Sequence, residues 1–199
     1  MTLWVRCRRA TTTLPAGCAA AFVLALLLGG TAVPLPALTL GGSATVQLTQ
    51  FVPVLLAGVL ALCLDTRVPA AEASGIRKIR RLDAVLVLGV IALLELVGAA
   101  TALALDEPST HPMWTLGRNT ACAAGLLLLV RPWLGRASVM VPVAMVFGVV
   151  LFGYRRPSDP YPWGFILEPA TSPLAAVACA VIAAAGLITH VLAAQKEEL

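Results

Sequence analysis

The sequence has few charged residues. Charged side chains make up only 12% of its 199 residues, whereas hydrophobic side chains make up 59%. Ordinary soluble domains carry about 25% charged residues. A chain this poor in charge cannot cover its surface with polar groups, so we predict an integral membrane protein. The formal net charge is +4, but the cations lie at the ends of apolar runs. They therefore indicate contact with anionic lipid and no binding of nucleic acid.

Histidine and cysteine are also scarce. The sequence contains two histidines, His111 and His190, and five scattered cysteines. No pair has the spacing of a metal site, and the two histidines are predicted to lie on opposite faces of the membrane. We predict no metal site and interpret the cysteines as small residues that pack within membrane helices.

Sequence motifs for nucleotide binding and hydrolysis are missing. The sequence has no Gly-x-x-x-x-Gly-Lys-Ser/Thr loop, no Gly-x-Gly-x-x-Gly and no His-Glu-x-x-His. Ser138 lacks a histidine that would serve as its base. We therefore predict that the chain is not an enzyme and holds no cofactor. If ATP and Mg²⁺ are used, a partner ATPase must bind them.

Long apolar runs rich in Leu, Ala and Val dominate the sequence instead. Continuous runs favour membrane-spanning helices, because the strands of a membrane barrel alternate polar and apolar residues. The predicted fold is all-α, with one transmembrane domain over residues 1–199. Its six spans are expected at about residues 14–33, 46–64, 82–105, 113–130, 137–154 and 173–194.

Two features concern the first span and the loop after it. The first apolar run follows a basic start, as in a signal peptide, but it is longer than usual and lacks a persuasive cleavage site. We predict a retained helix that ends at Pro34-Leu35-Pro36, followed by a flexible outer turn at Gly41-Gly42-Ser43.

The distribution of cations predicts the orientation. Eleven of the fourteen Lys and Arg residues fall in segments on one side of this layout; the exceptions are Arg118, Arg155 and Arg156. Positive charge accumulates on the cytoplasmic side of membrane proteins. Both termini are therefore expected in the cytoplasm, with the protein in the plasma membrane.

The longest polar interval covers residues 67–82. Within it, Ile76, Ile79 and Leu82 recur at helical spacing, and the residues between them include Arg77, Lys78, Arg80 and Arg81. This pattern predicts a short amphipathic helix at the cytoplasmic face.

Glu95 is the strongest single-residue signal. It falls well inside the third predicted span, where a carboxylate is costly unless it is paired, protonated or hydrated. A substrate or proton site, a structural pair with Arg118 and a hydrogen-bonded neutral acid are all open. We predict that Glu95 and Arg118 pair, directly or through water, in an outer cavity.

The segment before the last span is aromatic and apolar, but too short to cross a membrane. It contains Trp163, Phe165 and Glu168. Two interpretations are open: a re-entrant or interfacial element, and an ordered outer loop anchored by aromatic side chains.

This layout resembles the permease subunits of type-2 ABC exporters, in the small form found in actinobacteria. The residues that carry the resemblance are Arg118-Asn119, Gly125-Leu126, Leu134-Gly135-Arg136, Pro142, Trp163 and Leu167-Glu168-Pro169-Ala170. The resemblance implies a separate ABC ATPase, a second permease and surrounding lipid as partners. It also implies that residues 75–82 form a coupling helix, with Ile76, Arg77, Lys78, Ile79, Arg80 and Arg81 as its partner-binding residues, and that residues 164–167 belong to an outer re-entrant element.

Two functions therefore compete. The first is a membrane-spanning permease subunit that exports a substrate with energy from a separate ATPase chain. The second is a non-transporting accessory, immunity or scaffold subunit of a larger complex. A secondary transporter ranks third, because Glu95 alone supplies an ionisable group at membrane depth.

Overall fold

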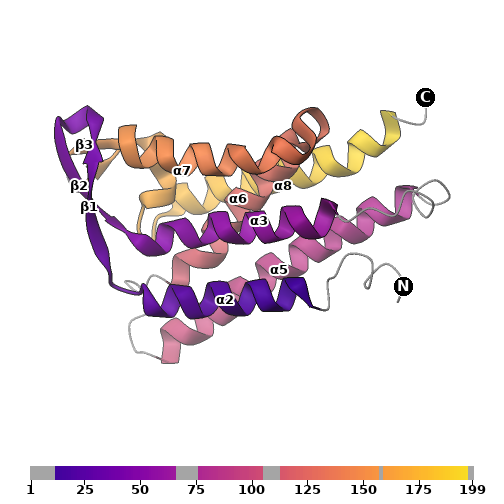
Figure 1. Cartoon of the computed structure of the whole chain (residues 1–199), viewed down its shortest axis with the longest axis horizontal. Helices are drawn as coiled ribbons and strands as arrows, with labels where there is room; N and C mark the ends of the chain where they lie inside the picture. Colours follow the sequence, from indigo (N-terminus) through magenta and orange to yellow (C-terminus); the bar gives the residue numbers. More distant parts are fainter. Residues whose placement is uncertain (1–11, 66–75, 105–112, 157–158, 197–199) are drawn as a thin grey trace.

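The computed structural model describes residues 12–65, 76–104, 113–156 and 159–196. Six α-helices within these residues lie side by side along the long axis of the molecule (Figure 1). They are α2 (Thr13–Leu27), α3 (Val52–Asp65), α5 (Ile76–Ala104), α6 (Met113–Leu134), α7 (Met140–Phe152) and α8 (Pro173–Lys196).

Four stretches of described helix are long and apolar enough to cross a membrane. They are Leu48–Asp65, Arg81–Thr101, Trp114–Phe152 and Pro173–Ala193, and Thr13–Leu27 is a shorter apolar helix. The prediction of a membrane-embedded, mainly helical protein is confirmed. The third stretch contains both α6 and α7, which fold back on each other at Gly135, where φ is +54°. Six crossings and their orientation stay a prediction.

The two ends of the helix bundle differ. At one end, which we call the basic end, α3 ends, α5 begins and α6 turns into α7 (Figure 1, right). At the other, which we call the hairpin end, strands β1 (Ala32–Ala37) and β2 (Gly42–Gln47) project from the helices (Figure 1, left).

The β1–β2 hairpin corrects the first two predicted spans. Helix α2 ends at Leu27, because Gly29 and Gly30 (φ +80°) interrupt it, and residues up to 33 are not helical. The predicted flexible turn is instead an ordered antiparallel pair in which Pro34 lies opposite Thr45. A two-stranded ribbon tolerates proline, since each strand has an open edge where no N–H is needed. The second span likewise begins late, with a 3₁₀ turn, η2 (Leu48–Phe51), before α3.

Smaller corrections concern the later segments. Helix α6 continues four residues beyond the predicted end of the fourth span, to Leu134, and the fifth span starts as a 3₁₀ helix, η3 (Gly135–Val139). The segment between α7 and α8 contains a short strand pair, β3 (Tyr154–Arg156) with β4 (Asp159–Pro160), and the 3₁₀ helix η4 (Pro162–Leu167). A further 3₁₀ turn, η1 (Leu38–Leu40), contacts β3, and Thr39 Oγ1 donates to the carbonyl of Tyr154 at 2.8 Å.

Helix α6 is the centre of the bundle. It packs against α3, α5, α7 and α8, and every residue from Leu116 to Gly125 is buried. Most of these residues are small or apolar, so the neighbouring helices can enclose α6 on all sides. The surfaces of α5 and α8 that face away from α6 carry exposed large apolar side chains suited to lipid, namely Leu88, Leu93, Leu96, Val177, Val181 and Ile188.

The basic amphipathic segment is helical, as predicted, but it is not a separate helix. Residues from Ile76 onward form the first turns of α5, which runs without a break to Ala104. At 29 residues, α5 is about 43 Å long, against about 30 Å of hydrocarbon in a bilayer. The side chains of Ile76, Arg77, Lys78, Ile79 and Arg80 lie outside the described part of the structure.

Candidate functional site

Arg118 links the central helix α6 to the segment between α7 and α8. Its side chain is buried on α6, and its guanidinium donates to the carbonyl oxygens of Glu168 at 2.8 Å and Pro169 at 3.0 Å. Arginine keeps its charge in proteins, and a buried charge is costly unless polar partners surround it. The carbonyl dipoles at the end of η4 supply these partners, and Glu168 adds electrostatic attraction.

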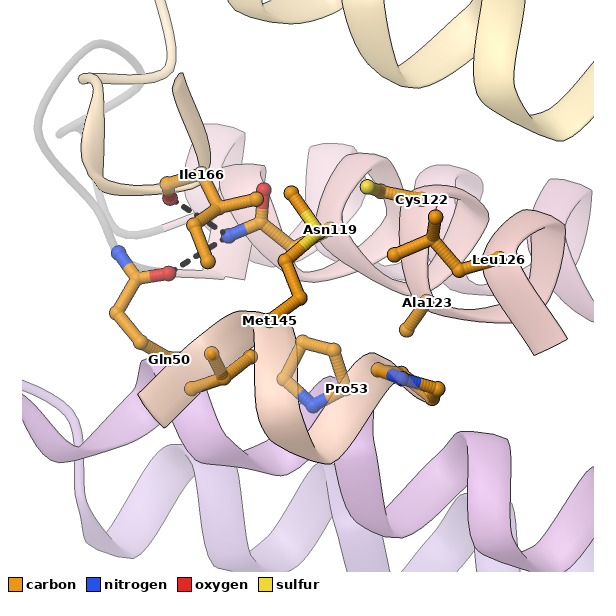
Figure 2. A pocket seen from close by; sticks show the side chains of 10 residues that line it. Gln50, Pro53, Asn119, Cys122, Ala123, Leu126, Met145 and Ile166 are labelled. Atoms are coloured by element: carbon orange, nitrogen blue, oxygen red, sulfur yellow. Dashed lines mark hydrogen bonds between the residues drawn. The ribbon is translucent and has the colours of Figure 1, made fainter. Parts of the chain in front are cut away.

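The next residue on α6 extends this network. Asn119 accepts a 3.2 Å hydrogen bond from Arg118 Nε, and its amide nitrogen donates to Gln50 Oε1 at 2.7 Å. The same nitrogen donates to the carbonyl of Ile166 at 3.1 Å (Figure 2). We call this network the clamp; it consists of the side chains of Gln50, Arg118 and Asn119 and the carbonyls of Ile166, Glu168 and Pro169. It joins three segments of the chain at the hairpin end.

The clamp holds the segment that was predicted to be re-entrant. Trp163 is exposed and stacks on Tyr161 with ring centroids 6.3 Å apart, whereas Phe165 packs against the core. Gly164 is buried, and a Cβ there would lie 3.1 Å from the carbonyl oxygen of Gly153. The segment is therefore an ordered 3₁₀ element folded against α7. Whether it enters the membrane stays a prediction.

Glu95 lies beside the clamp but outside it. Its side chain packs over Gly117 of α6, where an added Cβ would come within 2.6 Å of the Glu95 carboxyl carbon. Glu95 is exposed at the surface of the single chain, whereas Arg118 is buried. They are close enough to interact electrostatically. Within the described residues, however, no direct ion pair joins them, since the guanidinium donates to Asn119, Glu168 and Pro169. A water-bridged pair stays a prediction.

A second buried arginine lies at the basic end. Arg131, near the end of α6, forms an ion pair with Asp65 at the end of α3. The Arg131 side chain is 7% exposed and that of Asp65 is 23% exposed. Neither residue was predicted to pair, because Asp65 and Arg131 are remote in the sequence and both stand at predicted span ends.

The described bundle contains a small cavity between α3, α6 and α7. Its volume is about 10 Å³, which suffices for one water molecule or one ion. The residues around it include Gln50, Pro53, Asn119, Cys122, Met145 and Ile166 (Figure 2). This cavity is too small for an organic substrate, whose sites occupy roughly 300–1,000 Å³.

Comparisons with known proteins identify no relative. No protein-family model matches the chain, and no match is found among curated proteins or solved structures. The resemblance to ABC permeases therefore rests on the residues and the topology of this chain alone.

The sequence analysis named Arg118 and Glu168 as site residues, whereas Asn119 and Pro169 entered it only through the family resemblance and Gln50 was missed. Gln50 and Asn119 are uncharged, and nothing in the sequence places them together across 69 residues. Two adjacent polar residues inside an apolar helix, Arg118 and Asn119, were the available signal, because both must find partners when buried.

Proposed function

We propose that this chain is a membrane-spanning subunit of a transporter whose energy comes from a separate ATPase chain. The observation that carries the proposal is the uninterrupted α5. This helix begins with basic residues that lie outside the apolar stretch Arg81–Thr101. Further along, it crosses α6 where Glu95 packs over Gly117. A rigid helix of this kind transmits a displacement of its basic end to the centre of the bundle.

The position of Glu95 supports a second permease as a partner. A carboxylate on the lipid-facing surface of a bundle is costly, and Glu95 is exposed within the apolar stretch of α5. Another chain packed against this face would cover the carboxylate and enclose a pathway between the two bundles. A pathway of this kind agrees with the small size of the cavity inside the single chain.

The accessory, immunity or scaffold subunit is the second candidate. It is favoured by the fact that the chain itself supplies the hydrogen-bond acceptors for Arg118. Under this function the bundle packs against its partners without moving a substrate. In both cases we propose a multi-pass protein of the plasma membrane with cytoplasmic termini.

Affinity purification of the full chain in mild detergent tests the first proposal. We expect an ATPase chain to copurify, and expect its ATP hydrolysis to respond to a transported substrate. The charge reversals Arg77→Glu and Arg80→Glu should weaken this association and leave membrane insertion intact. Arg136→Glu is the matched control, because Arg136 is exposed at the same end of the bundle but belongs to η3.

The possible results separate the two candidates. Loss of the ATPase from the α5 variants but not from the η3 control supports the permease. Copurification of other membrane chains without an ATPase supports the accessory subunit and contradicts the proposed permease function.

A further inference from the structure

The β1–β2 hairpin has two outer edges, and its hydrogen-bond register shows which backbone groups reach them. The backbone N–H of Leu48 donates to the carbonyl of Thr31 at 3.1 Å, which extends the register in which Pro34 lies opposite Thr45. Hydrogen-bonded and non-hydrogen-bonded pairs alternate along an antiparallel ladder. The residues whose backbone groups point away from the partner strand are therefore Ala32, Pro34 and Pro36 of β1 and Ser43, Thr45 and Gln47 of β2.

The two edges differ in their protection against further strand pairing. On β1, Pro34 and Pro36 lack the N–H group that would point outward, and proline at an edge is a device that prevents the addition of another strand. The outer edge of β2 has no such device. Its residues Ser43, Thr45 and Gln47 keep their N–H groups, the register is regular, and the strand contains neither proline nor a charged side chain. An open edge of this kind accepts another strand.

The open edge of β2 points sideways from the end of the bundle. The inner face of the strand is covered, because Ala44 and Val46 belong to the same apolar cluster as Val149 of α7. Figure 1 shows both strands running steeply across the direction of the helices. The sheet therefore lies across the hairpin end, and its free edge is directed parallel to the membrane that the helices cross. Among the described elements, β2 packs mainly against β1 and η1, and the side chains of its three outward residues are exposed.

We propose that β2 pairs in an antiparallel arrangement with β2 of a second copy of this chain, so that two hairpins form one four-stranded sheet over two bundles. Two copies inserted in the same direction hold their hairpins at the same height, and a two-fold axis along the membrane normal reverses the strand direction. The outward residues are spaced evenly about Thr45, so Thr45 pairs with its counterpart while Ser43 pairs with the partner's Gln47. Because β2 carries no charge, identical strands meet without repulsion.

Cysteine cross-linking of the full chain in lipid vesicles tests the pairing and its register. The five native cysteines are replaced by alanine, and Thr45→Cys is introduced. Opposed residues of a hydrogen-bonded pair lie about 5.5 Å apart at Cα, a distance that a disulfide spans. With an added oxidant, we expect Thr45→Cys to give a covalent dimer. Ala32→Cys is the matched control, because it is exposed on the same face of the hairpin but lies at the β1 edge, so it should stay monomeric.

Proline substitution measures the contribution of the edge. Thr45→Pro removes an N–H that points away from β1, so the hairpin should keep its own hydrogen bonds, and thermal unfolding with gel filtration checks the fold. Both hydrogen bonds of the central pair are lost, so dimerisation in vesicles, measured by fluorescence energy transfer, should weaken by roughly 10-fold or more. Ala32→Pro, at the β1 edge, should leave dimerisation unchanged.

Three results would overturn the proposal. Thr45→Cys could cross-link no better than Ala32→Cys, it could cross-link to a different chain, or Thr45→Pro could dimerise as tightly as the parent protein. The inference does not depend on an ATPase partner. A dimer that Thr45→Pro retains would contradict pairing through β2 but not the proposed second permease at Glu95, so the two proposals fail separately.

Discussion

Helix α6 buries two arginines in different ways. Arg118 and Arg131 are similarly buried, at 7% and 8% exposure, and lie about 20 Å apart along the helix. Arg131 pairs with a carboxylate, whereas Arg118 donates to two backbone carbonyls and a side-chain amide oxygen. One end of the bundle is thus held by opposite charges and the other by aligned dipoles.

The difference determines what each site requires. An ion pair depends mainly on the charge, which lysine also provides. The clamp depends on the planar fork of guanidinium donors, which reaches acceptors in several directions at once. It also fastens η4, a segment with little regular structure of its own, to the most buried helix. Replacement of the buried arginine by lysine should therefore destabilise the protein more at the hairpin end than at the basic end.

The largest effect is expected from Arg118→Gln. This change removes three hydrogen bonds and leaves the carbonyls of Glu168 and Pro169 without their donors, so the unfolding free energy should fall by roughly 3 kcal/mol. Thermal unfolding in detergent measures it. Arg118→Lys should recover less than half of the loss, whereas Arg131→Lys should remain close to the parent protein. Equal tolerance of lysine at both positions would remove the proposed contrast.

A smaller, asymmetric effect is expected at the basic end. Asp65→Asn leaves Arg131 charged and buried and should cost about 2 kcal/mol. Arg131→Gln leaves a carboxylate that is partly exposed, so about 1 kcal/mol is expected. A double-mutant cycle in detergent gives the coupling between the two side chains. If the coupling is zero, the ion pair does not hold this end together.

The sequence predicted the helices better than the site. Long apolar runs gave α5, α6 and α8 to within a few residues at most ends, since periodicity and span length depend on local composition. The β1–β2 hairpin was missed because residues 32–33 are apolar enough to extend the preceding helix, and because prolines, as at Pro34 and Pro36, are depleted in strands. The clamp was missed for another reason: it depends on which segments of the chain are neighbours, and no local pattern contains that information.

The next prediction concerns the crossing of α5 and α6. Gly117→Ala would place a Cβ 2.8 Å from the backbone nitrogen of Glu95, so the helices must separate. We expect a loss of about 1.5 kcal/mol in the unfolding free energy, as for other overpacked contacts. Gly89→Ala on α5 is the control, because nothing lies within 4 Å of its Cβ position. That control should be neutral or slightly stabilising, since alanine favours helix more than glycine does.

The smallest effect is expected for the coupling between Glu95 and Arg118. The sequence predicted that they pair directly or through water; if they formed a direct buried pair, removing one partner would cost roughly 3–5 kcal/mol. In the structure the guanidinium already has its acceptors, and Glu95 is exposed on the single chain. We therefore expect a coupling below about 0.5 kcal/mol in a double-mutant cycle of Glu95→Gln and Arg118→Gln, because solvent weakens the interaction of the exposed Glu95 carboxylate with Arg118. A coupling of several kcal/mol would instead show that water or a second chain joins the two groups. A stable Glu95→Gln protein that has lost transport would assign Glu95 to the pathway between the bundles, where its carboxylate has a function that folding does not require.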